Sequence, residues 1–157
     1  MAELDDRLLA LEDRAAIEML IATYGPLADS GDATGVSNLW VEDGTYTVGG
    51  FGTASGRSEI AALIEGPTHQ QLMREGCAHV LSPHVIELDG DQATASGYSI
   101  VFRKQGDGFE AWRVSANRWQ FFRTENGWRV KHRDNAPLDG GDAARVLLSQ
   151  PTALHRQ

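Results

Sequence analysis

The sequence predicts an α+β fold in which one strongly curved, mixed but mainly antiparallel sheet wraps around N-terminal helices. Helical patterns occupy the first half of the chain, whereas residues 77–136 form an almost continuous run of strand patterns. Helices followed by a run of antiparallel strands are typical of the α+β class. With 157 residues, 41% of them hydrophobic, the chain can bury one sizeable core. We therefore expect a single domain over residues 1–157, with its core at about 8–137 and a C-terminal extension at 138–157.

The first element is expected to be an amphipathic helix that kinks or stops near Gly25-Pro26, because proline lacks a backbone donor and crowds the preceding turn. Residues 27–31 should add one more turn, and Asp32 is a plausible N-cap for a short helix over residues 33–39. The apolar side chains of the first helix recur every three or four residues, namely Leu8, Leu11, Ala15, Leu20, Ile21 and Tyr24.

The pattern then changes to alternation at residues 44–48, which predicts a strand. A second helical stretch begins at Ser58 and ends before Gly66-Pro67. Long strands with bulges are expected at about 77–88, 92–104, 109–124 and 127–136, separated by turns rich in Gly, Asp and Asn. A short helix over Asp142–Ser149 and a frayed tail after Pro151 should complete the chain. A sheet curved in this way leaves a cavity on its concave face, where small ligands bind.

The composition excludes several classes of protein. Fourteen basic against 22 acidic residues give a net charge of −8, which disfavours a nucleic-acid partner because phosphate is repelled. The single cysteine, Cys77, excludes an internal disulfide and any cysteine-cluster metal site. No apolar stretch approaches the length of about 20 residues that a membrane helix needs, and the acidic start differs from a signal peptide. We expect a cytoplasmic protein without a membrane partner.

Familiar catalytic motifs are absent from the sequence, including phosphate-binding loops, nucleophile elbows and zinc-protease signatures. His79 and His84 lie five residues apart on one predicted strand, so they should point to opposite faces and could not share one ion. We therefore expect neither a metal nor a cofactor.

Asp29 and His79 are the strongest candidates for chemistry. Asp29 follows the apolar run from Tyr24 to Ala28, although it could equally cap the turn before Gly31. On a strand, Cys77 and His79 share a face because they lie two residues apart. A carboxylate opposite His79 would fix the imidazole tautomer and stabilise the imidazolium. Around a Gly-Pro kink, Tyr24 could reach the mouth of the same cavity.

Several segments together resemble the SnoaL-like branch of the nuclear-transport-factor-2-like superfamily over residues 8–137, whose fold is a cone-shaped α+β barrel. The resemblance lies in the order and spacing of Arg14-Ala15-Ala16-Ile17, Tyr24 with Asp29, Leu39–Tyr46, Gly56–Ile60, His79 and Asn126–Val130. Within that branch the sequence looks most like the group of scytalone dehydratase, bile-acid 7α-dehydratase and hexachlorocyclohexane dehydrochlorinase. That likeness implies catalytic roles for Asp29, His79 and Tyr24, and pocket positions for Tyr46, Cys77 and Arg133. The second histidine of scytalone dehydratase has no counterpart at residues 97–101.

The resulting hypothesis is a cofactor-independent lyase that dehydrates a small apolar ring compound of steroid, terpenoid or aromatic polyketide type. His79 would act as the base, Asp29 would stabilise it, and Tyr24 or Arg133 would steady the developing oxyanion or the leaving hydroxyl. Trp40, Tyr46, Tyr98 and Trp112 could line the pocket, and each could equally be ordinary core. Arg133 could instead form a surface ion pair with Asp134 or Glu110. An isomerase, or a module that only binds ligands or assembles, remains an alternative.

Aromatic side chains on both faces of the strand at 109–124 predict self-association as a dimer or trimer. They are Trp112, Trp119, Phe121 and Phe122.

Overall fold

The computed structural model describes residues 1–149, so the tail after Pro151 lies outside the described residues. Five helices and seven strands follow one another in this part of the chain. They are α1 (Ala2–Ser30), α2 (Ala33–Asn38), β1 (Trp40–Val48), β2 (Gly52–Ser55), α3 (Gly56–Glu65), α4 (Pro67–Glu75), β3 (Cys77–Leu81), β4 (Val85–Asp89), β5 (Gln92–Gln105), β6 (Gly108–Thr124), β7 (Gly127–Pro137) and α5 (Asp142–Ser149).

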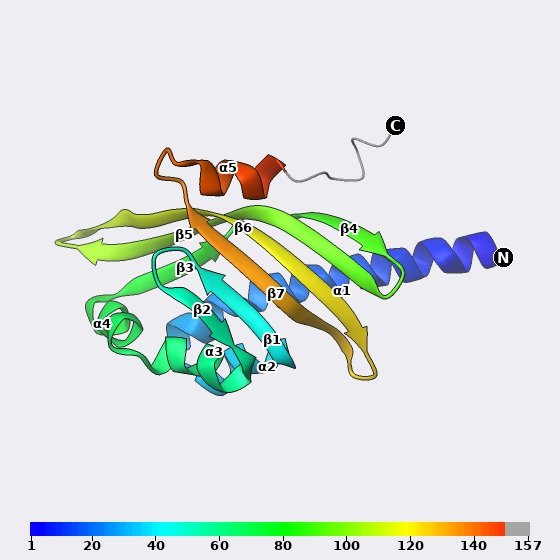
Figure 1. Cartoon of the computed structure of the whole chain (residues 1–157), viewed down its shortest axis with the longest axis horizontal. Coiled ribbons are helices and arrows are strands. Elements are labelled where there is room, and N and C mark those ends of the chain that lie inside the picture. The colour runs from blue at the N-terminus through cyan, green and yellow to red at the C-terminus, as the bar shows by residue number, and fades with distance from the viewer. Residues whose placement is uncertain (150–157) are drawn as a thin grey trace.

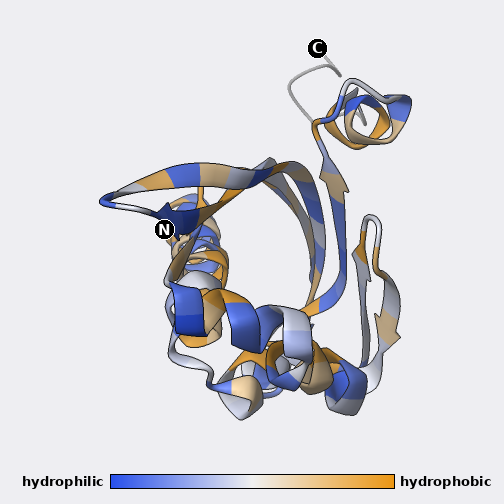
Figure 2. Cartoon of the chain, turned by 90° about the vertical axis from the view of Figure 1, so that its left-hand side faces the viewer, coloured by the Kyte–Doolittle hydropathy of each residue, from blue (hydrophilic) through white to orange (hydrophobic). Residues whose placement is uncertain are grey.

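The strands form one curved sheet in the order β2-β1-β7-β6-β5-β3, and β4 also pairs with β5. All pairs are antiparallel except β1 and β7, which run parallel. The sheet bends over the helices of the N-terminal half, while α5, next to the C label in Figure 2, lies outside the curve. The predicted α+β cone with a mixed sheet around N-terminal helices is confirmed, although the sheet is curved without being closed.

The core fills the concave side of the sheet. Buried side chains from α1, α2 and α3 pack there against large residues of β1, β6 and β7, with Trp40, Trp119 and Phe121 at 0% exposure. A smaller cluster on the convex side joins Ala144 of α5 to Ala116 and Ala136 of the sheet. None of the described helices is both long and apolar enough to cross a membrane.

Helix α1 runs unbroken through Gly25-Pro26 and ends at Gly31, which adopts a left-handed conformation with φ of 74°. The predicted kink or stop at this dipeptide is therefore wrong. Pro26 is exposed and removes only one helical hydrogen bond. Gly25 serves packing instead, because a Cβ at this position would lie 2.2 Å from the carbonyl oxygen of His79. The missing side chain allows α1 to approach β3 closely.

The buried face of α1 also differs from the predicted one. Leu8, Leu11 and Ala15 are exposed, because the first turns of α1 extend past the edge of the sheet (Figure 1). Ile21 and Tyr24 are buried as predicted, and the other buried side chains of the helix are Asp13, Ile17 and Ala28.

Other boundaries follow from local chemistry. Asp32 caps α2 as expected, accepting a hydrogen bond from the backbone N–H of Gly35 at 2.7 Å. The strand predicted at 77–88 is split into β3 and β4 around Pro83, which has no N–H for a strand ladder. The prediction that His79 and His84 lie on one strand is therefore wrong, because β3 ends at Leu81 and β4 begins at Val85. The long strands β5 and β6 do carry register shifts, at Val101/Phe102 and Gln120/Phe121.

Candidate active site

A cavity of about 240 Å³ lies between the concave face of the sheet and helices α1, α3 and α4. This volume is slightly below the range of about 300–1,000 Å³ that is usual for ligand pockets. Most of its lining is apolar. Its main polar side chains are Tyr24, Tyr46, His69, His79, Arg113 and Arg133.

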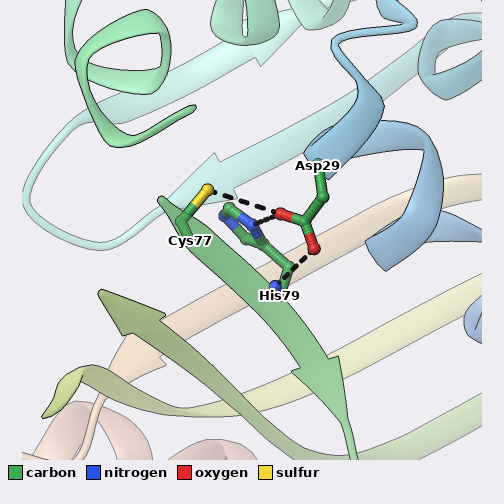
Figure 3. A group of neighbouring side chains, drawn as sticks. All are labelled: Asp29, Cys77 and His79. Carbon is green, nitrogen blue, oxygen red and sulfur yellow. Dashed lines mark hydrogen bonds and ion pairs between the residues drawn. The ribbon is translucent and has the colours of Figure 1, made fainter. Parts of the chain in front are cut away.

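Asp29 and His79 form a hydrogen-bonded pair at the edge of this cavity (Figure 3). Asp29 lies in the last turn of α1 and His79 in the middle of β3. The His79 ring nitrogen Nδ1 lies 2.6 Å from Asp29 Oδ1, and the His79 backbone N–H donates to Oδ2 at 2.8 Å. The two side chains are 14% and 26% exposed, so the pair is largely shielded from water.

The electrostatics of the pair define its tautomer. Burial acts to raise the pKa of Asp29, but the hydrogen bonds from the His79 ring and backbone outweigh it and leave this pKa below its ordinary value. Asp29 is therefore an ionised carboxylate that accepts the Nδ1–H of His79. In the neutral form of the His79 ring the other nitrogen, Nε2, then carries no proton and can act as a base.

Cys77 also contacts the carboxylate of Asp29. Its thiol Sγ donates to Asp29 Oδ1 at 3.6 Å (Figure 3). Burial and the negative charge of Asp29 raise the pKa of Cys77 to about 11. Cys77 is thus a protonated thiol that orients Asp29, and it does not line the cavity, contrary to the prediction.

Asp29, Cys77 and His79 are also the residues that could hold a metal ion, since one donor atom from each lies within 4.8 Å of the others. A metal would have to displace the hydrogen bonds that Asp29 accepts. It would also need the Cys77 thiolate, which the raised pKa disfavours. The donor set therefore fits acid–base chemistry better than metal binding.

His69 was not predicted as a site residue, but it lies in the cavity wall beside His79. It comes from α4, is 8% exposed, and its ring centroid is 5.3 Å from that of His79. Its Nε2 lies 2.7 Å from the carbonyl oxygen of Ala28 and must donate to it. Burial lowers the pKa of His69, so the ring is neutral and its Nδ1 is an acceptor. No sequence signal marked His69, because α4 itself was not predicted.

Tyr24 and Tyr46 line the cavity as predicted, whereas Trp40 lies behind them. Trp40 is completely buried, stacks on Tyr46 with ring centroids 5.7 Å apart, and meets Tyr24 edge-on at 6.2 Å. Trp40 is therefore a support for the two tyrosines and not a lining residue. Burial raises the pKa of Tyr46 far above its ordinary value, so its hydroxyl keeps its proton.

Arg133 is 1% exposed and lies at the centre of an aromatic cage in the cavity wall. Its guanidinium lies 4.3 Å from the ring centroid of Tyr24, 4.6 Å from that of Tyr46 and 4.1 Å from that of Trp119. Nε and Nη2 both donate to Asn117 Oδ1, at 2.9 and 2.7 Å, whereas Nη1 has no partner in the part of the chain that the structure describes.

The alternative of a surface ion pair for Arg133 is wrong. Asp134 lies on the other side of β7, where it pairs with His132 at 2.9 Å, and Glu110 pairs with Arg103. Alternation along β7 explains the difference, because neighbouring side chains of a strand point to opposite faces.

Of the two remaining predicted pocket residues, Trp112 and Tyr98, only Trp112 lines the cavity. Trp112 lines the cavity and is 37% exposed. Tyr98 does not line it: this side chain is 47% exposed on the convex face, because its neighbour Ser99 takes the inward position and accepts a hydrogen bond from Asn117.

A curved α+β cone that encloses an apolar cavity with an Asp–His pair defines a protein of the nuclear-transport-factor-2-like superfamily. Residues 9–134 match the family model described as SnoaL-like domain. The chain belongs to the SnoaL-like family.

Solved structures agree with this assignment. An NTF2-like protein with a cystatin-like fold from Novosphingobium aromaticivorans is 57% identical, with 96% of this chain and 97% of that chain covered and a TM-score of 0.93. A putative aromatic ring hydroxylase from the same organism is 25% identical (82% and 90% covered, TM-score 0.64). ActVI-ORFA from Streptomyces coelicolor shares the fold at 18% identity (81% and 98% covered, TM-score 0.70). No curated protein matches the sequence.

Proposed function

We propose that the protein is a cofactor-independent lyase that removes water from a small cyclic compound carrying an activating carbonyl. The observation that carries the proposal is the 2.6 Å contact between His79 Nδ1 and Asp29 Oδ1, which leaves Nε2 as a base beside a largely apolar cavity. Likeness to the dehydratase group of the SnoaL-like branch supports the same reaction.

The reaction needs two proton transfers at His79. Nε2 takes a proton from the carbon next to the carbonyl, and the electron pair of that C–H bond forms an enolate. Asp29 stabilises the imidazolium that results, and Tyr24 or Arg133 steadies the enolate oxygen. The C–O bond to the neighbouring hydroxyl then breaks, and this group leaves as water with the proton from His79. Positioned acid–base groups of this kind contribute about 10²–10⁴-fold in rate.

Replacement of Asp29 tests the mechanism. In Asp29→Asn the amide can donate to Nδ1, so the proton of the neutral ring moves to Nε2 and the base is lost. We expect turnover of a cyclic β-hydroxy ketone, followed by ultraviolet absorption of the conjugated product, to fall by about 10³–10⁴-fold. His79→Gln should have a similar effect.

Asp32→Asn is the matched control, because asparagine also caps a helix and Asp32 lies outside the cavity. A chelator should leave turnover unchanged. A folded Asp29→Asn or His79→Gln protein with full turnover would contradict the mechanism. If the natural protein binds such ring compounds without converting them, a ligand-binding module replaces the lyase. A product of unchanged mass indicates an isomerase.

We also propose that the protein self-associates through its convex face. The aromatic argument for this needs correction, because Trp119 and Phe121 are buried in the core and Phe122 is half-buried. The apolar side chains that are exposed there are instead Val80, Tyr98, Val114 and Leu138, called here the convex patch. Val80 of β3 and Val114 of β6 pair with the same β5 residue, Ile100, from the two strands beside it. The three side chains therefore form one continuous row across the sheet.

A further inference from the structure

Two arginines enter the same cavity from neighbouring strands. Arg113 of β6 and Arg133 of β7 both line it, and within the described residues neither forms an ion pair with a carboxylate. This is unexpected in a chain with a net charge of −8. No carboxylate is among the described residues that line the cavity, and Asp29, at its edge, already accepts a hydrogen bond from His79.

Neutral groups hold both guanidiniums. Arg113 Nη2 donates to the carbonyl oxygen of Gly49 at 2.7 Å and to Asn135 Oδ1 at 2.8 Å. The amide of Asn135 in turn donates at 3.2 Å to Asn117 Oδ1, the same atom that accepts from Arg133. Amide oxygens fix the two side chains without cancelling their charges. Burial lowers the pKa of Arg113, and the positive charge of Arg133 acts in the same direction.

One of the two arginines also carries an unpartnered donor. Among the described residues, two buried side-chain polar atoms have no hydrogen-bond partner, Arg133 Nη1 and Ser115 Oγ. Ser115 lies two residues before Asn117 on β6 and is opposite Ser99 of β5. A buried donor without an acceptor is costly, and more so when it is charged. Arg133 is 1% exposed and lines the cavity, so an acceptor on a ligand in the cavity can satisfy its Nη1.

We propose that Arg113 and Arg133 form an anion subsite, and that the substrate carries a negatively charged oxygen group on its apolar ring. Carboxylates and acidic phenols share this chemistry. The inference rests on the proposed function for the reaction, but anion binding itself requires no turnover. A neutral ketone could accept from Nη1 but would leave both charges uncompensated, whereas a monoanion satisfies the donor and compensates one of the two charges. With the two arginines on the anion, the Tyr24 hydroxyl is left to meet the activating carbonyl.

The test compares ring compounds of one size and different charge. 2-Naphthoate and the neutral 2-naphthamide are titrated at neutral pH by isothermal calorimetry, together with 2-naphthol and a nitro-naphthol that is ionised at this pH. We expect the naphthoate or the ionised nitro-naphthol to bind at least about tenfold more tightly than its neutral analogue. Preference for the naphthoate identifies a carboxylate substrate, and preference for the nitro-naphthol identifies a phenolate.

Variants connect this preference to the subsite. Arg113→Gln should reduce the ratio of the two affinities by about tenfold, and Arg133→Gln should do the same if thermal unfolding shows that it folds. Arg118→Gln is the matched control, because Arg118 lies on the same strand but faces the convex side, where it contacts Ser96. Equal binding of charged and neutral compounds, or an unchanged ratio in Arg113→Gln, would overturn the proposal.

The same titration in His79→Gln separates this proposal from the proposed function. The subsite requires the preference for the anion to persist in that variant, whatever happens to turnover. Loss of the preference in a folded His79→Gln protein would count against the subsite.

Discussion

Because Gly25 has no side chain, α1 can lie close against β3. The helix passes so near the His79 carbonyl that any Cβ would collide with backbone, which cannot move aside as a side-chain tip can. Asp29, one turn further along α1, reaches His79 only because of this approach. A residue without a side chain thus helps to position the candidate catalytic pair.

We predict that Gly25→Ala destabilises the protein, although the same change in an ordinary helix stabilises by about 0.5–1 kcal/mol. Overpacking against backbone should cost about 1–3 kcal/mol in the free energy of unfolding, measured with urea. Turnover should fall as well, because α1 must move away from His79. Pro26→Ala, at the next and exposed position, should keep activity and at least the natural stability. A fully stable and active Gly25→Ala protein would refute this account.

The sequence indicated the centre of the site and part of its wall, with Tyr24, Tyr46 and Arg133 among the residues that line the cavity. Asp29 and His79 were singled out from their places at a helix end and on a strand, and the family resemblance then implied their catalytic roles. Arg113 and Asn117 were not identified, because their direction depends on the register shift at Val101/Phe102 and on which face of β6 is concave. Tyr98 was misplaced for the same reason, since one residue of register reverses the face of a strand.

At the scale of elements, α1 is fastened to the far end of the sheet by a charged contact. Asp13 accepts hydrogen bonds from Arg123 Nη1 and Nη2, each at 2.7 Å, and from Trp128 Nε1 at 2.9 Å. Both partners lie beside the turn that joins β6 and β7. Hydrogen bonds from Arg123 lower the pKa of Asp13 below its ordinary value of 3.8, despite the opposing effect of burial.

This contact predicts how stability depends on pH. Because the pKa of Asp13 is lower in the folded state, its contribution is complete above the unfolded-state value of about 3.9 and is lost as pH falls through the folded-state value. Asp13→Asn should lower the free energy of unfolding by about 1–3 kcal/mol near neutral pH. The difference in Tm between the two proteins should shrink on acidification from about pH 6 to about pH 3. A constant difference would show that Asp13 acts through packing alone.

Most elements could be predicted from the sequence, and the errors have local causes. Pro67 was interpreted as a break, but it occupies the first turn of α4, where proline costs no hydrogen bond. The short strand β2 depends on pairing with β1, which a pattern of four residues cannot reveal. Strands β5, β6 and β7 lie within one residue of their predicted bounds, because Gly-rich turns delimit them.

At the scale of the whole molecule, the distribution of charge and of apolar surface determines which ligands and partners can bind. The interpretation that residues 1–157 form one domain stays a prediction. The net charge of −8 contrasts with the two cations of the cavity, so the proposed anionic ligand would gain attraction only once it is inside. The convex patch borders α5, and that helix covers a neighbouring part of the same face.

We predict that the protein sediments as a dimer or trimer at micromolar concentration and that Val114→Glu shifts it towards the monomer. A carboxylate in the middle of the convex patch would have to be buried in the interface without a partner. Val146→Glu is the matched control, because Val146 is 56% exposed on α5 and lies outside the patch. A natural protein that is monomeric in sedimentation velocity would contradict self-association.

Because β1 pairs with β7, the wall of the cavity can be completed only after β7 has been synthesised. Tyr46 of β1 stands directly beside Arg133 of β7, although β7 is the last strand to leave the ribosome. A nascent chain that stops before β7 has the Asp29–His79 segments but lacks one wall of its cavity. The cavity is therefore complete only after β7 has been synthesised, and a ligand bound there can stabilise only molecules whose synthesis has passed this strand.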